Sequence, residues 1–339
     1  MSNIPIVQFG NTGLKVSCLA LGTMTFGLQI DEAASYAILD KATGEGINFI
    51  DTANVYPLGG TPETAGRTEE IIGRWLRRDG ANRRGEFVLA TKGGGRMGPN
   101  PWDEGASRKH LLDALDASLK RLQTDYVDLY QLHHEDRRTP LDELVEAFDT
   151  IVRSGRARYV GVSNLLAYRV ARAIGKAEAR RLVKPVSIQP RYSLLFREIE
   201  RELLPLAQEE NLAVIPYNPL AGGLLTGKYT AGGASSPEAN TRFTLGTAGG
   251  MYRDRYWHDN YFATVQKIQE IANEVGVALP TLAVAWVLAN PQVTSPLLGA
   301  SKPEQLDATL AAAHYVLDPE VKQRLDDLTA EYRRGDAPR

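Results

Sequence analysis

The feature that most constrains the fold is a regular alternation between short apolar runs and longer amphipathic segments. The runs are typical of buried strands, and the segments between them repeat apolar residues with the period of a helix. The runs cover residues 17–22, 48–51, 87–92, 126–133, 159–164, 187–190, 213–217 and 294–300. The helical segments cover residues 31–45, 66–79, 107–122, 140–154, 165–182, 199–210, 260–275 and 303–313. Eight repeated strand–helix units favour an α/β fold, namely a closed (β/α)8 barrel of the TIM type.

Residues at several segment ends support these boundaries. Ser107 is expected to cap the start of one helix, and Gly46 and Gly155 follow the ends of two others. Ser301 is expected to open the last helix, with Glu304 three residues later completing a capping box.

The length of 339 residues would allow two domains, but an α/β barrel commonly uses this length as one. No linker rich in Pro, Gly or Ser divides the chain near its middle, so we expect one domain over residues 1–330. A doubly wound open sheet is the main alternative. Residues 1–16 are expected to form a hairpin, turning at residues 11–13, that caps the bottom of the barrel. Residues 331–339 are expected to be a frayed tail.

Composition argues against several functional classes. The net charge is −2, so neither nucleic acid nor an anionic membrane is an expected partner. The single cysteine, Cys18, cannot form an intrachain disulfide and is expected to be a buried small hydrophobic residue. Neither a secretory signal nor an apolar run of membrane-spanning length is visible, so we expect a cytoplasmic protein. No Cys/His cluster at metal-binding spacing is visible, so no metal site is expected.

Four chemically active residues lie at or just beyond the ends of consecutive strands. Asp51 ends the second run, Lys92 the third and His133 the fourth, while Tyr56 follows Asp51 in a loop. In an α/β barrel the carboxyl ends of the strands surround one mouth, where active sites lie. The four side chains are therefore expected to meet there.

The alternation of side chains along a strand refines this expectation. It places core-type residues on the faces that carry Asp51, Lys92 and His133, with Gln131 as the exception on the His133 face. It directs His134 to the opposite side, so His134 is not expected at the site.

The four residues suit the reduction of a carbonyl group by general-acid catalysis. The ordinary tyrosine pKa of about 10 is too high for easy proton exchange at neutral pH, and a nearby lysine ammonium is expected to lower it. Asp51 would hold Lys92 charged, His133 would orient the carbonyl oxygen, and Tyr56 would protonate that oxygen as a hydride reaches the carbon. Each residue alone has an ordinary structural explanation, but four at consecutive strand ends favour a joint role.

Six segments together resemble the aldo-keto reductase superfamily. They are GTMTFG, FIDTANVY, LATKGG, LKRLQTDYVDLYQLH, GVSN and IPYNPLAGGLLTGKY, which begin at residues 22, 49, 89, 119, 161 and 215. The resemblance runs in order from Val7 to residue 313 and is strongest to the branch with potassium-channel β-subunit-like and bacterial Tas-like reductases. That family folds as a (β/α)8 barrel and uses NADPH. Its Asp–Tyr–Lys–His tetrad corresponds here to Asp51, Tyr56, Lys92 and His133.

The resemblance also implies a set of cofactor contacts. Ser163, Asn164 and Gln189 would face the nicotinamide carboxamide, and the ring of Tyr217 would stack on the nicotinamide. Capping of the helix at 165–182 is the alternative role of Ser163 and Asn164. The other implied contacts are Gly22, Thr23, Met24, Asp51, Asn218, Leu220, Gly222, Leu224, Lys228, Gly299, Ser301, Lys302 and Gln305.

The adenosine end of the cofactor site departs from the family pattern. Lys302 would face the 2′-phosphate of NADP near the start of the last helix. Many relatives carry Glu and Asn where Ala308 and Thr309 stand, and several carry Arg in place of Ser301.

Two further patterns resemble nucleotide-binding loops but are rejected. GGGRMG at 93–98 follows a strand, but prolines follow it and no helix begins before Ser107, as a Rossmann motif would require. GGLLTGKY at 222–229 ends in Tyr229, where a P-loop needs Ser or Thr to bind magnesium.

We therefore expect NADPH-dependent reduction of an aldehyde or ketone, with a small carbonyl compound as partner and, as a further candidate partner, a second copy of this chain in a homo-oligomer. A sugar-like carbonyl or an enone is an alternative substrate. A second alternative is a non-catalytic, redox-sensing binding protein of the β-subunit kind, although no additional N-terminal interaction segment is visible. A third is a Schiff-base aldolase with Lys92 as nucleophile, which an Asp51-bound ammonium disfavours.

Substrate choice is expected to depend on the loops around the mouth. The long Gly-rich insertion at 221–259 should contribute most, because loops of that length in a compact domain are commonly functional. The expected substrate-facing parts are Pro57–Ala65, Met97–Trp102, His134–Arg137 and, within the insertion, Tyr252, Tyr256 and Trp257.

Overall fold

The protein folds around a sheet of eight parallel strands, seen in a computed structural model that describes residues 4–229, 237, 239 and 241–334. The strand order is β10-β3-β4-β5-β6-β7-β8-β9, which follows the chain without the reversal of a doubly wound sheet. The strands are β3 (Ala20–Gly22), β4 (Phe49–Asp51), β5 (Val88–Gly93), β6 (Val127–Leu132), β7 (Ala157–Ser163), β8 (Ser187–Gln189), β9 (Ala213–Val214) and β10 (Leu297–Leu298).

The sheet closes between β9 and the segment that leads into β10. Val214 pairs with Val293 in a parallel bridge, and the Leu297 N–H donates to the Pro216 carbonyl oxygen at 2.8 Å. On its other side Leu297 pairs with Ala20 of β3. The predicted (β/α)8 barrel is therefore confirmed.

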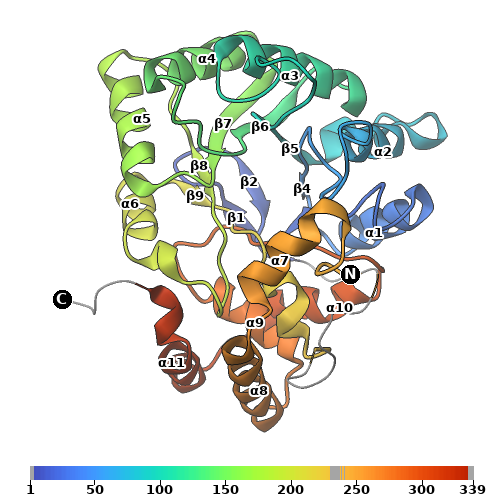
Figure 1. The fold of residues 1–339 in the computed structure, drawn as a ribbon, viewed down its shortest axis with the longest axis vertical. Coiled ribbons are helices and arrows are strands. Elements are labelled where there is room, and N and C mark those ends of the chain that lie inside the picture. The colour runs from blue at the N-terminus through green and yellow to red at the C-terminus, as the bar shows by residue number, and fades with distance from the viewer. Residues whose placement is uncertain (1–3, 230–236, 238, 240, 335–339) are drawn as a thin grey trace.

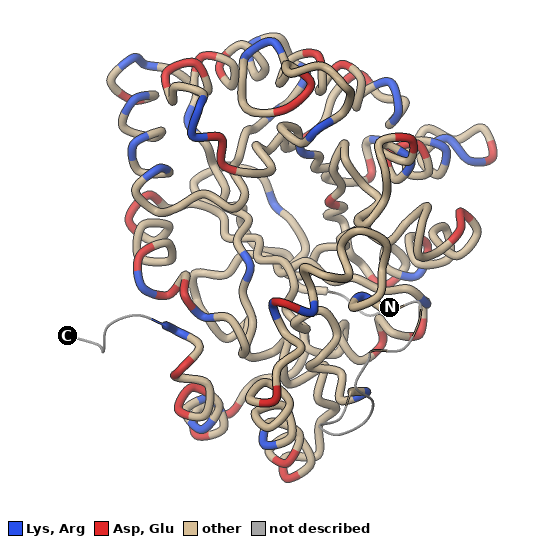
Figure 2. Tube along the Cα trace, viewed as in Figure 1, with Lys and Arg blue, Asp and Glu red and all other residues tan. Residues whose placement is uncertain are grey.

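Helices surround the barrel, and many of the charged residues lie on these helices and on the loops between them (Figures 1 and 2). In α3, Leu111, Leu115 and Leu119 recur at helical spacing and are buried against the strands. The helices expected from the sequence are α1 (Glu32–Gly44), α2 (Arg67–Leu76), α3 (Arg108–Leu122), α4 (Leu141–Arg153), α5 (Ala167–Ala179), α6 (Leu203–Glu209), α8 (Asp259–Glu274) and α10 (Gln305–Leu310). Three more were not assigned from the sequence, namely α7 (Gly249–Tyr256), α9 (Leu279–Leu288) and α11 (Pro319–Leu328).

Some predicted helix ends are confirmed and others are wrong. The Ser107 hydroxyl oxygen accepts from the His110 N–H at the start of α3, and Gly46 and Gly155 lie just past two helix ends with positive φ. The predicted Ser301–Glu304 capping box is wrong, because the Ser301 N–H and hydroxyl both donate to the side-chain oxygen of Gln305.

The N-terminal hairpin plugs the bottom of the barrel, as predicted. Strands β1 (Ile6–Gln8) and β2 (Lys15–Ser17) pair antiparallel, and Phe9 packs edge-on against Phe49 of β4 at 5.7 Å between ring centres. Gly10 in the turn has φ +55°, and a Cβ there would lie only 2.6 Å from the Ala213 backbone nitrogen. The turn therefore touches the lower end of β9, where only glycine fits.

The insertion after β9 packs around its own aromatic side chains. Phe243 lies 5.1 Å from Tyr229, 4.8 Å from Trp257 and 6.4 Å from Tyr252, all between ring centres and all edge-on. Two short 3-10 helices, η4 (Ala221–Thr226) and η5 (Gly246–Ala248), precede α7 within it. In Figure 1, α7 crosses in front of the strands at one side of the barrel.

The expected fraying of the C-terminal tail is wrong for its first four residues. The 3-10 helix η7 (Ala330–Arg333) buries Tyr332, whose ring stacks on Tyr261 at 5.0 Å. Residues 335–339 lie outside the described part of the chain.

Two expectations about single features can be compared with the structure. Cys18 is buried, and that burial raises the pKa of its thiol to about 11, so it is an inert core residue. Within the described residues no one helix is long and apolar enough to cross a bilayer, and α8 and α9 pass that test only as a pair bent by 94°.

Candidate active site

The expected four residues meet at the mouth of the barrel. Asp51 is the last residue of β4, Lys92 lies near the end of β5, and His133 directly follows β6. Parallel pairing sets Asp51 beside Ala90, and Lys92 beside Gln131, so each site residue lies two positions beyond the partner of the one before it. Tyr56 reaches the same place from the loop after β4.

A buried ion pair between Asp51 and Lys92 forms the base of the site. The Lys92 ammonium donates to Oδ1 of Asp51 and to the Thr52 carbonyl oxygen, the latter at 2.8 Å. The other carboxylate oxygen, Oδ2, accepts from the amide nitrogens of Gln131 at 3.1 Å and Gln189 at 2.9 Å. A buried carboxylate is costly without partners, and here both oxygens have them.

Burial and the ion pair act on Lys92 in opposite directions. Burial lowers the pKa of the ammonium, and the adjacent Asp51 carboxylate raises it again in part. Both groups that accept from Nζ are oxygens, which suits the protonated form of the lysine.

Tyr56 lies above this pair and beside His133. The Lys92 nitrogen is 5.2 Å from the centre of the Tyr56 ring, and the Tyr56 and His133 rings meet edge-on at 5.7 Å. Burial raises the pKa of Tyr56 well above 10, and the Asp51 charge raises it further. The expected lowering of this pKa by Lys92 is therefore wrong for the protein without ligands, because the ammonium is directed to Asp51. Tyr56 is a neutral phenol with a proton to donate.

The two neighbouring histidines stack on each other. Their rings are 4.2 Å apart and nearly parallel, so the expectation that His134 points away from the site is wrong. Burial lowers the pKa of His133 well below 6.5, and His134 and Lys92 lower it further. His133 is thus neutral at pH 7. Its buried Nδ1 has no hydrogen-bond partner among the described residues.

The residues implied for the nicotinamide lie directly beside this group. Asn164, in a left-handed conformation, donates to the His133 carbonyl oxygen at 3.0 Å and accepts from the Tyr217 hydroxyl at 2.9 Å. The Ser163 hydroxyl donates to the Gln189 carbonyl oxygen at 2.8 Å. Neither Ser163 nor Asn164 caps α5, which follows Leu166 without a side-chain cap, so that alternative is wrong.

Other implied cofactor contacts are only partly available. The Thr23 hydroxyl donates to the Asp51 carbonyl oxygen at 2.9 Å, and Leu224 is completely buried, so neither side chain is exposed in the protein without ligands. Asn218 accepts from the Gly222 N–H at 2.8 Å and thereby shapes the start of the insertion. Gly22 ends β3 and Met24 lies in the loop that follows it, and both are partly exposed.

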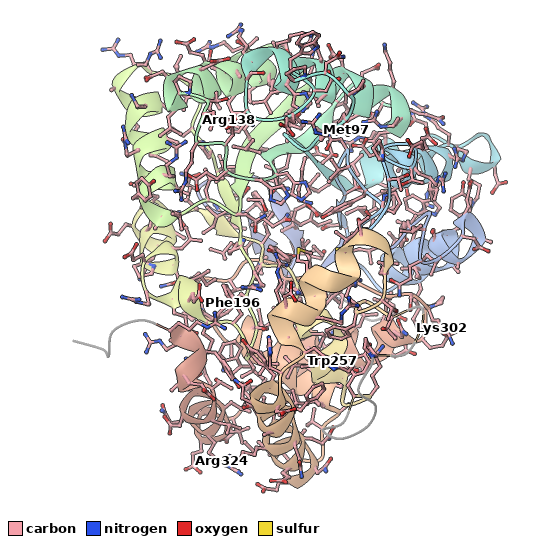
Figure 3. The ribbon with its side chains drawn as sticks, in the orientation of Figure 1. Met97, Arg138, Phe196, Trp257, Lys302 and Arg324 are labelled. Carbon is pink, nitrogen blue, oxygen red and sulfur yellow. The ribbon has the colours of Figure 1, made fainter. Side chains whose placement is uncertain are left out.

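Three cationic side chains lie on the segments that carry the remaining implied cofactor positions. Among the described residues, Lys228, Arg242 and Lys302 have no carboxylate within ion-pair distance, and one buried Arg242 nitrogen has no hydrogen-bond partner. The segments that carry them follow β9 and β10, which lie side by side where the barrel closes. Arg242 was not expected from the sequence. Lys302 is labelled in Figure 3.

The expected substrate-facing aromatics of the insertion are mostly inside it. Tyr252 and Tyr256 are only 2% and 1% exposed, and Trp257 packs against Phe243. Trp102, in contrast, is 53% exposed on the loop after β5. Figure 3 shows Met97, Arg138, Phe196 and Trp257 on segments around the opening.

The structure shows the backbone at the two rejected nucleotide motifs and the distribution of side chains that could bind a metal. Residues 94–98 form a loop, and α3 begins only after Ser107. Residues 222–226 belong to the 3-10 helix η4, with no α-helix directly after it. Nowhere in the described ranges do three or more His, Cys, Asp or Glu side chains gather as a metal site would require.

Comparison with known sequences is consistent with this geometry. Residues 18–330 match the aldo/keto reductase family. The chain is 42% identical over 324 residues to an uncharacterized oxidoreductase, YrpG, of Bacillus subtilis, with 94% of each chain covered. It is 37% identical over 328 residues to a probable voltage-gated potassium channel subunit beta of Arabidopsis thaliana, with 95% of each covered. It is 36% identical over 343 residues to the protein Tas of Escherichia coli, with 95% of this chain and 96% of Tas covered.

Proposed function

Because this chain belongs to the aldo/keto reductase family, we propose that it is an NADPH-dependent reductase that converts an aldehyde or ketone to an alcohol, with Tyr56 as the proton donor. The observation that carries the proposal is the position of Tyr56, a neutral phenol between His133 and the buried Asp51–Lys92 pair. No hydrogen-bond partner of the Tyr56 hydroxyl is found among the described residues, so its proton is available to a substrate.

Each residue of the site has a distinct part in this reaction. The neutral His133 can donate a hydrogen bond to the carbonyl oxygen and orient it toward Tyr56. As Tyr56 loses its proton, the phenolate develops next to the Lys92 ammonium, which stabilises it. Asp51 fixes the ammonium in that position. The nicotinamide cofactor, when bound, supplies the hydride.

The residues suited to hold that cofactor come from neighbouring strand ends. Ser163, Asn164 and Tyr217 offer amide and ring contacts beside His133. Lys228, Arg242 and Lys302 offer unpaired positive charge for its phosphates, which favours NADPH because of its additional 2′-phosphate.

A Schiff-base aldolase has less support. The Lys92 side chain is fully buried, and its nitrogen already donates to Asp51 and Thr52. Before Lys92 could attack a carbonyl carbon, its nitrogen would have to lose its hydrogen bonds to Asp51 and Thr52.

A non-catalytic, redox-sensing binding protein is the second candidate, because relatives are named as probable channel subunits beta. This candidate would have the same cofactor site as the proposed reductase, but it would not turn over a substrate. A protein of this kind would bind NADPH and reduce no carbonyl compound.

The first experiment replaces Tyr56 with Phe. We expect kcat for 4-nitrobenzaldehyde to fall by about 10²–10⁴-fold, because the general acid is lost. The Kd of NADPH, measured by quenching of intrinsic fluorescence, should stay within about twofold, since the hydroxyl is not a proposed cofactor contact. NADH, titrated in parallel, should bind more weakly to both proteins.

Tyr130→Phe is the matched control, because it also removes a tyrosine hydroxyl from the barrel. That hydroxyl donates to the Leu111 carbonyl oxygen away from the mouth. The control should keep its kcat. A Tyr56→Phe protein that turns over at the parent rate would refute the acid assignment, and a parent that binds NADPH but reduces no aldehyde would favour the binding-protein candidate.

A further inference from the structure

A pocket of about 500 Å³ opens next to the proposed nicotinamide residues. Asn164, Tyr217 and Arg255 of α7 are among the residues that line it. Asn164 also donates to the His133 carbonyl oxygen, so the pocket adjoins the catalytic group through one residue. It lies between the loops after β7 and β8 and the helix α7, and it could not be predicted because these segments are far apart in the chain.

Two arginines in this pocket have no carboxylate partner. Arg191 lies with its guanidinium carbon 3.5 Å from the Phe196 ring centre, and Arg255 lies 6.0 Å from the Tyr252 ring centre. Neither forms an ion pair within the described part of the chain. Aromatic rings hold both guanidinium groups in place without neutralising their charge.

The other charged side chains that line the pocket have partners of their own or lie at its exposed rim. Arg334 is paired with Glu198 at 3.4 Å, and Arg201 donates to the Arg334 carbonyl oxygen at 3.3 Å. Glu202 lies on the exposed rim. The unbalanced charge in the interior is therefore positive and belongs to Arg191 and Arg255.

The field of these two arginines reaches the catalytic side of the pocket. Burial raises the pKa of the Tyr217 hydroxyl, and Arg255 and Arg191 oppose that rise. Burial lowers the pKa of His134, and Lys92 and Arg255 lower it further. Arg255 is thus close enough to act on groups on both sides of Asn164.

We propose that this pocket, the arginine pocket, binds a carboxylate or phosphate group of the carbonyl substrate between Arg191 and Arg255. The proposal rests on the reductase function and specifies its substrate class as anionic aldehydes and ketones. Guanidinium groups bind carboxylate and phosphate through paired, charge-assisted hydrogen bonds, and both arginines retain free donors for them. The apolar walls, which include Phe196 and Ile199, suit the carbon skeleton between the two ends of the substrate.

The test compares aldehydes that differ in charge. 4-Carboxybenzaldehyde is paired with neutral 4-nitrobenzaldehyde, and glyceraldehyde 3-phosphate with glyceraldehyde. We expect the parent to have the lower KM for the charged member of at least one pair, and the pair that shows it identifies carboxylate or phosphate as the bound group. Arg191→Gln and Arg255→Gln should each raise that KM by about tenfold or more and leave the neutral KM within about twofold.

The controls separate this pocket from charge loss in general and from the cofactor site. Arg324→Gln removes an arginine that pairs with Glu274 at the lower edge of the molecule in Figure 3, outside the pocket lining, and should change neither KM. Arg255→Lys keeps the charge and should recover part of the lost affinity. The Kd of NADPH should be unchanged in every variant, and a large rise in it would overturn the proposal by assigning the arginines to the cofactor.

A binding measurement keeps the two proposals distinguishable. 4-(Hydroxymethyl)benzoate, the expected product, is titrated calorimetrically into the parent and into the Arg191→Gln/Arg255→Gln protein. Binding to the parent alone supports the arginine pocket even if no aldehyde is reduced, in which case only the reductase proposal fails. Equal binding to both proteins, or equal KM changes for charged and neutral aldehydes, would overturn the arginine pocket and leave the reductase proposal standing.

Discussion

At the scale of single residues, the site is built around the Asp51 carboxylate, and both of its oxygens accept hydrogen bonds. Asp51 receives Lys92 on one oxygen and two glutamine amides on the other. This arrangement explains how a charged pair is tolerated inside the barrel, because each buried charge is met by hydrogen bonds. It also makes Gln131, which is not among the implied cofactor contacts, a positioning residue for Asp51.

Replacing Gln131 with Leu tests that role. A hydrogen bond to a buried charge contributes about 1.5–3 kcal/mol, so we expect kcat to fall roughly tenfold or more while the KM and the NADPH Kd stay near parent values. Steady-state kinetics and fluorescence titration measure the three quantities. Gln323→Leu, on the exposed face of α11, is the control for the substitution itself. An unchanged kcat would mean that Lys92 and Gln189 are sufficient to hold Asp51.

At the scale of single residues, the sequence could predict the position of a side chain only where the backbone is a regular strand. Asp51, Lys92 and His133 could be placed because each ends an apolar run, and strand ends meet in a barrel. The orientation of His134 was wrong because β6 ends at Leu132, so strand alternation does not extend to it. Arg191, Arg242 and Arg255 could not be placed, since they lie on loops or in the insertion, where no periodic pattern orients a side chain.

At the scale of elements, two segments complete the barrel from opposite ends. The hairpin β1–β2 fills the bottom with Phe9, and the insertion with α7 borders the mouth. The hairpin could be predicted from its short turn. Helix α9 could not be predicted by period, because Leu279 and residues 281–287 are all buried and the helix is apolar on every side. Its sequence therefore lacks the contrast between faces that marks a surface helix.

The hairpin makes a separable prediction about stability. Phe9 is completely buried, so Phe9→Ala should lower the free energy of unfolding by about 3–5 kcal/mol, and Phe9→Leu by about 1.5 kcal/mol or less. Chemical denaturation measures both changes. Because the mouth is at the opposite end, kcat per folded molecule should remain at the parent value. A loss below about 1 kcal/mol for Phe9→Ala would show that the plug is not part of the cooperative core.

At the scale of the whole molecule, the barrel is a ring with a separate core on each side of its wall. The inner core joins the hairpin to residues of several strands, including Phe49, Ala90 and Leu129. The outer core lies between strands and helices. Functional groups are gathered at one end of this ring, so the rest of the molecule acts as a rigid frame for them.

Two buried histidines predict how the stability of this frame depends on pH. Burial lowers the pKa values of His110 and His133 below 6.5, so the unfolded chain binds more protons than the folded one under mildly acidic conditions. The free energy of unfolding should therefore fall as the pH drops below about 6.5, by on the order of 1 kcal/mol per pH unit for each histidine. Urea unfolding between pH 7.5 and 5.5 measures this slope.

His110→Gln should reduce the slope of the unfolding free energy against pH by the contribution of one histidine. This holds whatever the substitution does to the free energy of unfolding at pH 7.5. The Asp136 carboxylate does not interfere in this window. Against the effect of burial, hydrogen bonds from the Ala106 N–H and the Thr139 hydroxyl lower the pKa of Asp136 to about 2, so its contribution is lost only in stronger acid. A parent stability that is constant from pH 7.5 to 5.5 would contradict the prediction.

The closure of the ring has a consequence for how the protein is made. Ala20 of β3 pairs with Leu297, which a ribosome synthesises near the end of the chain. Until then the nascent sheet has two unpaired edges, at β3 and β9, and such edges readily pair with the wrong partner. Long-range pairing of this kind also slows folding. Newly made chains therefore keep these edges unpaired until the final strand leaves the ribosome, and a chain truncated before Val293 would keep them permanently open.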